Sequence, residues 1–429
     1  MQPHKQSNQS NKRKIALVLS IIPGFGQFYN KQIVKGITFL ILTSAFIFAF
    51  GDLLRYGFWG LVTLGTDPQY DHSIFLLIEG ILTVLLAVLL AGIYIFNLYD
   101  AYKTGKKRDN EEEINGLKEQ YRSLVDNGFP YLIMSPGFLL MVFVVIFPIL
   151  FVILLSFTNY DLYHTPPASL VDWVGFKNFV DIFKVPIWRE TFFSVLSWTI
   201  VWTFVATSLQ IAVGIFLAVI VNQKDLKFKK IFRNILILPW AVPAFVSILV
   251  FAGMFNETFG TINRDILGFF GIENIPWMTN AMFTRLALIF IQTWLGFPFI
   301  FVMTTGVLQS IPNELYEAAE VDGATIFQKF RHITLPLVLF VTAPILITQF
   351  TGNFNNFNAI YLFNGGGPAM PGQNAGGTDI LISWIYSLTM TSAQYGKAAA
   401  ITMILSVIVI AVALWQFRRT KSFQEEDMM

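Results

Sequence analysis

The stretch that decides the fold class is LIMSPGFLLMVFVVIFPILFVILLSFT, residues 132–158, which carries no charged side chain. A helix needs about 20 consecutive apolar residues to cross the hydrocarbon core of a bilayer. On either side of this stretch lie seven further apolar segments, near residues 36–55, 75–98, 192–221, 234–255, 286–309, 337–362 and 396–417. The sequence therefore predicts an all-α polytopic membrane protein with eight transmembrane helices, of which 132–157 is the third.

The composition supports this interpretation and excludes several classes. Of the 429 residues, 55% are hydrophobic and 13% are charged, whereas soluble domains carry about 25% charged residues. A net charge of +2 gives no reason to expect a nucleic-acid partner, and the expected surroundings are membrane lipid. There is no cysteine, and the four histidines lie far apart, so no disulfide and no metal site is expected.

The distribution of Lys and Arg predicts the orientation of the spans. Eight spans place both termini on one side, and 22 of the 29 Lys and Arg residues lie on that side, against 7 on the other. Loops that stay in the cytoplasm carry the excess of positive charge. We therefore expect a multi-pass protein of the bacterial plasma membrane with both termini in the cytoplasm.

A hydrophilic linker over residues 103–126 divides the chain. It predicts an N-terminal extension (1–130) with two spans, a six-span core (131–417) and a cytoplasmic tail (418–429). Before the first span, residues 15–22 form an apolar run that Pro23-Gly24 interrupts, and no cleavage pattern follows. We expect an uncleaved half-helix there, and the sequence leaves open whether 15–35 is a re-entrant hairpin or a surface helix.

The six-span core contains almost no ionisable residue, although such groups usually mark ion or proton pathways in transporters. A sodium site built from carbonyls and hydroxyls would escape this test. No glycine-rich phosphate loop with Lys-Ser/Thr is present, so no cofactor and no catalytic residue is expected in this chain. If transport is active, its energy has to come from another subunit.

The loop over residues 310–336 reads SIPNELYEAAEVDGATIFQKFRHITLP. Pro312 suits a helix start, Gly323 suits a helix end, and Thr325 with Gln328 fits a capping box for a second helix. The loop thus predicts two short helices on the cytoplasmic surface. Leu315, Ala318 and Ala319 would share one face of the first helix, and a partner backbone could approach the alanines closely.

This loop resembles the coupling loop of binding-protein-dependent ABC importer permeases, whose pattern is Glu-Ala-Ala, three residues, Gly, nine residues, Ile-x-Leu-Pro. The matching positions, with the acidic residue before the glycine, are Glu317, Ala318, Ala319, Asp322, Gly323, Ile333, Leu335 and Pro336. The resemblance implies a type I ABC importer fold and docking to a cytoplasmic ATPase dimer, which binds the ATP and Mg²⁺. The alternative interpretation is an amphipathic surface helix without a partner.

Further segments resemble the larger permease subunit of maltose/maltodextrin importers: LPWAVP (238–243), FNETFG (255–260), WLGFPF (294–299), NFNNF (353–357) and NGGGP (364–368). The similarity covers about 131–417, and the two extra N-terminal spans also match. It implies a second homologous permease subunit and an extracellular sugar-binding protein as partners. The loop at 158–191 departs from the enterobacterial relatives, which carry a large folded insert there.

A polar stripe in the seventh span suggests the sugar site. On a continuous helix Gln349, Asn353 and Asn356 share one face, with Asn355 pointing elsewhere. Amides both donate and accept hydrogen bonds, as a sugar requires, but they also bond neighbouring helices to each other. The spacing alone leaves both roles open.

The resemblance to the maltose permease assigns sugar contacts to Asn353 and Asn356. It also implies contacts from Leu295, Gly296, Phe299, Trp240 and Ala244. Two positions depart from the relative: Gln349 replaces a serine, and Gly352 replaces a phenylalanine that stacks on sugar, which suggests a wider site for longer maltodextrins.

The sequence thus predicts the transmembrane permease subunit of an ATP-driven importer of maltose/maltodextrin-type oligosaccharides, alternating between inward- and outward-facing states. Prolines and glycines within the spans, among them Pro239, Pro243 and Pro298, would supply kinks. The alternatives are a permease for another oligosaccharide, an ion-coupled secondary sugar transporter, and a receptor or scaffold without transport. The last two do not account for the loop at 310–336.

Overall fold

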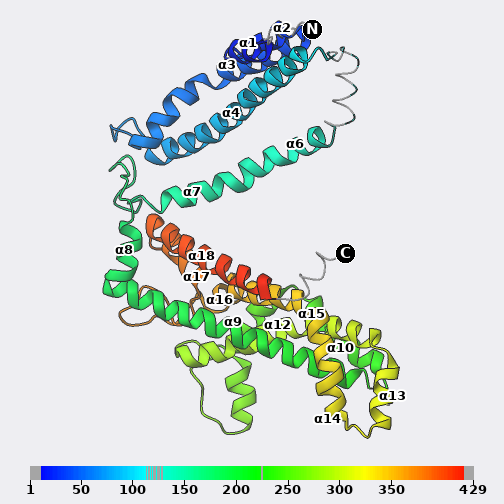
Figure 1. The fold of residues 1–429 in the computed structure, drawn as a ribbon. Helices are drawn as coiled ribbons and strands as arrows, with labels where there is room; N and C mark the ends of the chain where they lie inside the picture. The colour runs from blue at the N-terminus through cyan, green and yellow to red at the C-terminus, as the bar shows by residue number, and fades with distance from the viewer. Residues whose placement is uncertain are drawn as a thin grey trace. The chain divides into compact units, whose positions relative to one another are not determined.

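The computed structural model describes residues 11–112, 129–223 and 226–419, with single positions at 114, 116, 118, 122 and 126. These residues form helices and connecting loops, and two isolated bridges are the only β-type pairs among them. By its internal contacts the chain divides into two units, Met1–Val174 and Gly175–Met429. Figure 1 shows the order of the helices along the chain.

The eight predicted spans each overlap an apolar helix in the described part of the chain. In the described part of the chain, seven helical segments are long and apolar enough to cross a membrane, and one bent pair of helices supplies the eighth. Their bounds are Ile33–Thr63, Ser73–Asp109, Phe129–Leu155, Pro186–Val221, Lys229–Ala241 with Ala244–Met254, Ala281–Ser310, Ile326–Asn364 and Tyr395–Leu414. The predicted fold class is therefore confirmed.

The first unit is built on a long pair of helices. Its helices are α1 (Lys12–Leu19), α2 (Phe25–Tyr29), α3 (Ile33–Thr63), α4 (Ser73–Asp109), α6 (Phe129–Met141), η2 (Val142–Ile146) and α7 (Phe147–Leu155). Helices α3 and α4 lie side by side (Figure 1). A side chain at Gly57 would collide with Thr83, whose hydroxyl donates to the Leu53 carbonyl over 2.9 Å. Small residues thus let the two helices approach closely.

Residues 12–30 form a hairpin of two short helices that folds onto α4. Asn97 of α4 holds the turn between the two short helices in place. Its amide accepts from the Gly24 N–H over 3.1 Å and donates to the Ser20 carbonyl over 2.9 Å. Asn30 donates to the Ala101 carbonyl over 2.8 Å. The structure thus gives a hairpin for the segment whose conformation the sequence left open. The predicted linker at 103–126 begins inside α4 and is described continuously only to Glu112.

The third span, Phe129–Leu155, continues through α6, η2 and α7, and α7 packs against α4. It belongs to the first unit. The functional division into an extension (1–130) and a six-span core (131–417) stays a prediction.

The second unit is centred on two long helices, α9 and α12. Its helices are α8 (Lys177–Lys184), α9 (Pro186–Val221), α10 (Lys229–Ala241), α11 (Ala244–Met254), η3 (Ile262–Leu267), α12 (Ala281–Ser310), α13 (Asn313–Val321), α14 (Ile326–Lys329), η4 (Phe330–Thr334), α15 (Leu335–Phe354), α16 (Phe357–Asn364), α17 (Leu381–Met390) and α18 (Tyr395–Arg419). Gly214 on α9 lies against Ile300 on α12, where any side chain would clash. Trp202, Ile291 and Ile360 are fully buried in another core cluster of this unit.

Two spans of this unit are interrupted. Helices α10 and α11 meet at 89° around Val242-Pro243, and Pro243 is the N-cap of α11. Because proline disfavours a helical residue before it, the break falls there. Pro239 and Pro298 lie inside continuous helices, so they do not end them. The seventh span breaks at Asn355-Asn356, which corrects the expectation of a continuous helix over 337–362.

Candidate functional site

An open cavity of about 390 Å³ lies in the second unit. Five helices, α9, α11, α12, α15 and α16, surround it together with the end of α10. Its lining consists of Gln210, Trp240, Ala244, Ile248, Gln292, Leu295, Gly296, Phe299, Gln349, Asn356 and Asn358. Cavities that hold small molecules are commonly about 300–1,000 Å³. The size therefore suits one or two sugar rings.

The bend between α10 and α11 brings an aromatic wall to the cavity. Trp240 ends α10 just before the break, and Ala244 begins α11 just after it. The Trp240 ring meets the Phe299 ring of α12 edge to face, with 5.9 Å between centroids. All three residues were predicted from the resemblance, and the structure places them in one lining.

The break in the seventh span supplies the polar wall. Gln349 lies on α15, Asn356 is the N-cap of α16 and Asn358 lies in its first turn. The Asn356 amide oxygen accepts from the Ala359 N–H over 3.2 Å. Within the described residues the Gln349 amide has no hydrogen-bond partner, so its donor and acceptor are available to a ligand. Asn355 is exposed and does not line the cavity.

Asn353 lies four residues after Gln349 on α15 but does not line the cavity, so the lining contains only part of the predicted stripe. Its side chain is buried between helices, 4% exposed. It donates to the Thr207 hydroxyl over 2.7 Å and to the Gln210 amide oxygen over 3.1 Å, and it accepts from Gln292 over 2.8 Å. The helix end at Phe354 changes the direction of the chain before Asn356, so Asn356 reaches the cavity from the start of α16 and not from the helix that carries Gln349 and Asn353. In this conformation Asn353 bonds helices together.

The two predicted glycines have different surroundings. At Gly296 a Cβ atom would lie 2.3 Å from the Gln210 side chain, so glycine lets that side chain cross α12 beside Leu295. Gly352 does not line the cavity, and a Cβ there would meet nothing within 4 Å. The structure therefore does not bring Gly352 into the site, since it lies on an exposed part of α15.

Four lining residues were not predicted, namely Gln210, Ile248, Gln292 and Asn358. Gln210 and Gln292 are amides buried in apolar spans, and such residues usually bond helices or mark a pathway. That signal was present in the sequence. Gln292 donates to Asn353, while its own amide oxygen is buried without a hydrogen-bond partner in the described structure.

The lining carries no acidic or basic side chain. Its polar groups are amides, and its apolar groups are aromatic and aliphatic side chains. Within the described residues no three His, Asp or Glu side chains lie close enough together to hold a metal ion. The arrangement offers hydrogen bonds and flat apolar surfaces to an uncharged molecule.

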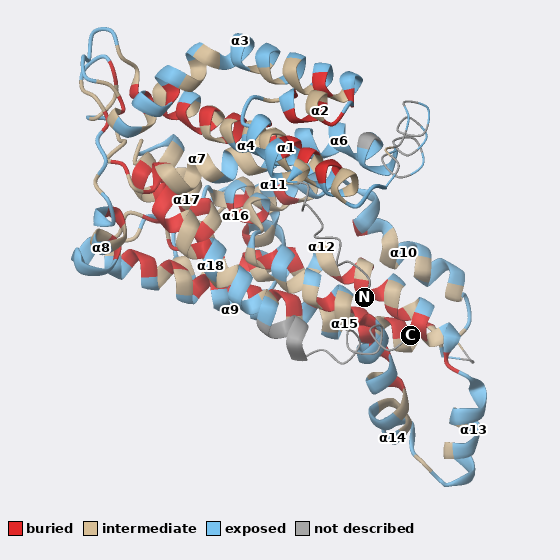
Figure 2. Ribbon diagram, turned by 45° about the horizontal axis from the view of Figure 1, so that its top comes forward, coloured by how far each residue is buried: buried red, intermediate tan, exposed pale blue. Residues whose placement is uncertain are grey.

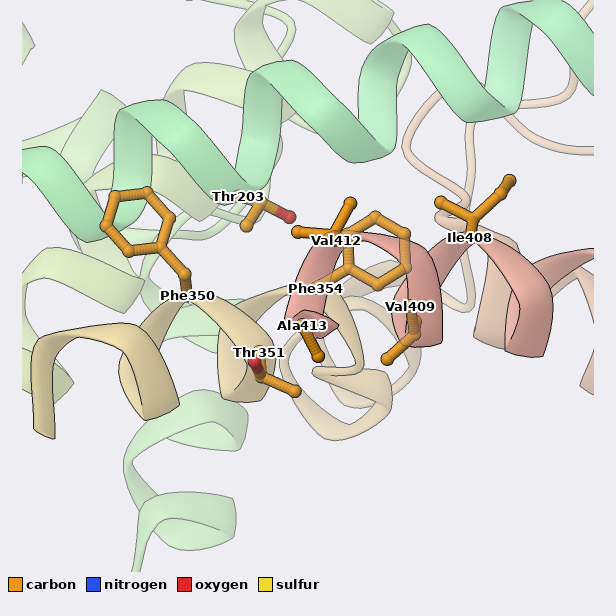
Figure 3. A pocket seen from close by; sticks show the side chains of 8 residues that line it. All are labelled: Thr203, Phe350, Thr351, Phe354, Ile408, Val409, Val412 and Ala413. Carbon is orange, nitrogen blue, oxygen red and sulfur yellow. The ribbon is translucent and has the colours of Figure 1, made fainter. Parts of the chain in front are cut away.

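A second, smaller cavity of about 120 Å³ lies between α9, α15 and α18 (Figure 3). Phe350, Phe354, Ile408, Val409 and Val412 make most of its wall. Its two threonines, Thr203 and Thr351, donate to carbonyls of their own helices. No hydrogen-bond donor faces it unsatisfied, so it does not suit a sugar.

The predicted coupling loop forms two short helices at one end of the unit (Figure 1). Helix α13 begins after Pro312, and the chain turns at Gly323, whose φ is 75°. The capping box at Thr325 and Gln328 is present. Leu335 and Pro336 open α15, and Ile333 lies two residues before Leu335 in η4. The predicted local structure is therefore confirmed.

The surface of this loop is mostly exposed (Figure 2). Glu317, Ala318 and Asp322 are exposed, and Ala319 is half-buried. Within this loop the most exposed apolar side chains are those of Val321, Ile326 and Phe327, which are 88%, 78% and 67% exposed. Exposed apolar side chains gathered on a loop outside the predicted spans are typical of an interaction site.

Hydrogen bonds to two carboxyl groups, those of the buried Asp379 and the half-buried Glu257, order two loops of the second unit. Burial raises the pKa of Asp379, although the Gly376 N–H and the Ser383 hydroxyl bond to it and oppose this effect. Burial also acts to raise the pKa of Glu257, but hydrogen bonds from Met278 and Thr279 outweigh this effect and lower the pKa. These contacts fix the loops over 256–280 and 365–380.

Comparison with known proteins agrees with this architecture. Residues 210–421 match the family described as binding-protein-dependent transport system inner membrane component. A galactooligosaccharides transport system permease protein, GanP of Bacillus subtilis, is 62% identical over 96% of this chain and 99% of its own length. A maltodextrin transport system permease protein, MdxF of the same organism, is 50% identical over 99% of this chain and 100% of its own.

A solved structure shares the fold. It is a bacterial ABC transporter involved in the import of the acidic polysaccharide alginate, and one of its chains matches with a TM-score of 0.58 and 21% identity. The match covers 71% of this chain and 99% of that chain. With relatives of 62% and 50% identity along nearly its whole length, the chain belongs to the family of binding-protein-dependent transport system inner membrane components.

Proposed function

We propose that this permease subunit imports neutral oligosaccharides and that the cavity between α9, α12 and α15 holds the sugar in passage. The observation that carries this proposal is the lining, which combines five amide side chains with aromatic rings and contains no charge. An amide pairs with a sugar hydroxyl as donor or acceptor. The faces of Trp240 and Phe299 suit the apolar face of a sugar ring.

Two groups of neutral sugar are favoured by specific relatives. The relative with 62% identity is named for galacto-oligosaccharides, and the one with 50% identity is named for maltodextrin. The sequence motifs resemble the maltodextrin permeases. Both sugars present rows of hydroxyls and no charge, so either is compatible with the cavity.

The partners follow from what this chain does not supply itself. We propose a second homologous permease across the open side of the cavity, an extracellular sugar-binding protein at the outer mouth, and a cytoplasmic ATPase dimer. The family description supports dependence on a binding protein. The excess of Lys and Arg supports cytoplasmic termini and a cytoplasmic position for α13 and α14.

The ATPase dimer would grip the exposed surface of α13 and α14 and bind ATP and Mg²⁺ itself. Its closure would move the coupling loop and, through α15, the wall of the cavity that carries Gln349. The permease pair would then alternate between inward- and outward-facing states. The sugar is held by amides that need not change charge, so no proton has to accompany it.

Gln349→Ala and Asn356→Ala test this proposal. We expect each variant to lower the affinity of uptake for sugar about fivefold or more, because each removes hydrogen bonds worth about 1 kcal/mol to the substrate. The measurement is uptake by the assembled complex in proteoliposomes, with malto- and galacto-oligosaccharides of increasing length.

Asn355→Ala is the matched control, because Asn355 is adjacent to Asn356 but exposed outside the cavity. Sugar uptake by the Asn355→Ala variant should equal that of the unchanged protein. Normal uptake by Gln349→Ala and Asn356→Ala, with the complex intact, would show that the sugar passes elsewhere.

A further inference from the structure

Helix α13 has little packing of its own. None of its nine residues is buried. Pro312 precedes it, and the left-handed Gly323 follows it, so neither end continues into another helix. Apart from the backbone at its two ends, α13 can therefore pass a force to the rest of the unit only through side chains that are at most half-buried.

Two such contacts join α13 to the segment that follows. The Tyr316 hydroxyl and the Thr334 hydroxyl lie 2.9 Å apart and share a hydrogen bond. The Lys329 ammonium lies 2.7 Å from the Glu320 carboxylate. Because Glu320 is 63% exposed, water screens this ion pair, and exposed pairs contribute little. The hydroxyl pair is the better shielded link, since Thr334 is only 6% exposed.

Thr334 occupies the position where this link has most effect. It is the last residue of the π-helix η4, and α15 begins at the next residue. The Thr334 hydroxyl does not cap α15. In the described structure this side chain instead shares its hydrogen bond with Tyr316. π-Helical turns occur often at functional sites, where the helix can adjust.

Helix α15 connects this point to the cavity. Gln349, in the cavity wall, lies on α15, 15 residues beyond Thr334, which corresponds to about 22 Å at 1.5 Å per residue. A displacement at the base of α15 therefore moves the amide wall with it, because the intervening segment is one continuous helix.

We propose that Tyr316 and Thr334 are positioning residues, whose shared hydrogen bond carries the movement of α13 into α15. This inference rests on the proposed function, because it assumes that an ATPase moves α13. Tyr316 neither touches the sugar nor needs to touch the ATPase. Its loss should therefore change how much transport each hydrolysed ATP yields, and leave ATPase binding intact.

A double-mutant cycle on the reconstituted complex tests the proposal. The variants are Tyr316→Phe, Thr334→Val and the pair together, and the readout is sugar molecules imported per ATP hydrolysed. We expect each single variant to lower this ratio about fivefold, as the loss of one hydrogen bond implies. The double variant should be no worse than either single one, and Thr334→Ser should restore the ratio.

Tyr94→Phe is the matched control, because Tyr94 also donates one hydrogen bond, to the Ile21 carbonyl over 3.1 Å, far from the loop in sequence. In Tyr94→Phe the number of sugar molecules imported per ATP hydrolysed should stay unchanged. Additive losses in the double variant, an unchanged ratio in Tyr316→Phe, or loss of the ATPase from that variant would each overturn the inference. Failure of the proposed function itself would look different, since the unchanged protein would then import no sugar or would import it without hydrolysing ATP.

Discussion

At the scale of single residues, Asn353 shows how a membrane protein uses an amide. Both donors of its side chain bond to α9, and its oxygen accepts from α12, so one residue of α15 joins three helices. The Trp202 indole adds a bond to its backbone carbonyl over 2.9 Å. In hydrocarbon such groups need partners within the protein, and an amide supplies several at once.

Asn353→Ala should therefore destabilise the complex by about 2 kcal/mol, because Gln292 and Gln210 each lose a partner inside the membrane. Thermal unfolding of the purified complex measures this change, and Asn355→Ala is the neutral control. A variant with unchanged stability and lost sugar affinity would instead make Asn353 a sugar contact.

The residues of the cavity could be predicted only in part from the sequence. Trp240, Phe299, Gln349 and Asn356 were identified and do line it. Gln210 was missed, although it is an amide in an apolar span, because no motif pointed to that span. Gln292 was missed although a lone amide in an apolar span is a signal in itself. Which of these residues touch sugar stays a prediction.

At the scale of elements, the breaks in the helices give the unit its cavity. The 89° bend at Pro243 and the interruption at Asn355 turn two spans so that polar and aromatic side chains converge. The lengths of the apolar segments predicted the spans well, because a helix needs a minimum apolar length to cross a bilayer. They could not locate the second break, since the helical period alone cannot show where a helix ends. The cluster of Asn residues was the available signal, because Asn has low helix propensity.

The joint between α13 and α14 depends on Gly323, whose φ of 75° favours glycine. Gly323→Ala meets no atom within 4 Å, so its cost is backbone strain alone, about 1 kcal/mol. We expect a weaker ATPase interaction, about fivefold in affinity, measured by binding of the purified ATPase. Gly306→Ala is the matched control, because Gly306 also has free space around it and lies inside α12. Equal affinity in the two variants would contradict the role of the turn.

At the scale of the whole molecule, the proposed function places substrate binding in the cavity of this chain and energy supply in a partner subunit. The cavity contains no ionisable group that could couple sugar to a proton, and the coupling loop exposes apolar side chains such as Val321 and Phe327 to a partner. The membership in a binding-protein-dependent family agrees with this separation. Energy from ATP hydrolysis would then reach the cavity as movement of α15.

The most direct test of this account is sugar accumulation in proteoliposomes that contain the permease pair with and without the ATPase. The account predicts accumulation against a gradient only with the ATPase and ATP present, with inhibition by vanadate and no effect of a proton or sodium ionophore. Uphill accumulation without the ATPase, or its collapse on addition of the ionophore, would contradict it.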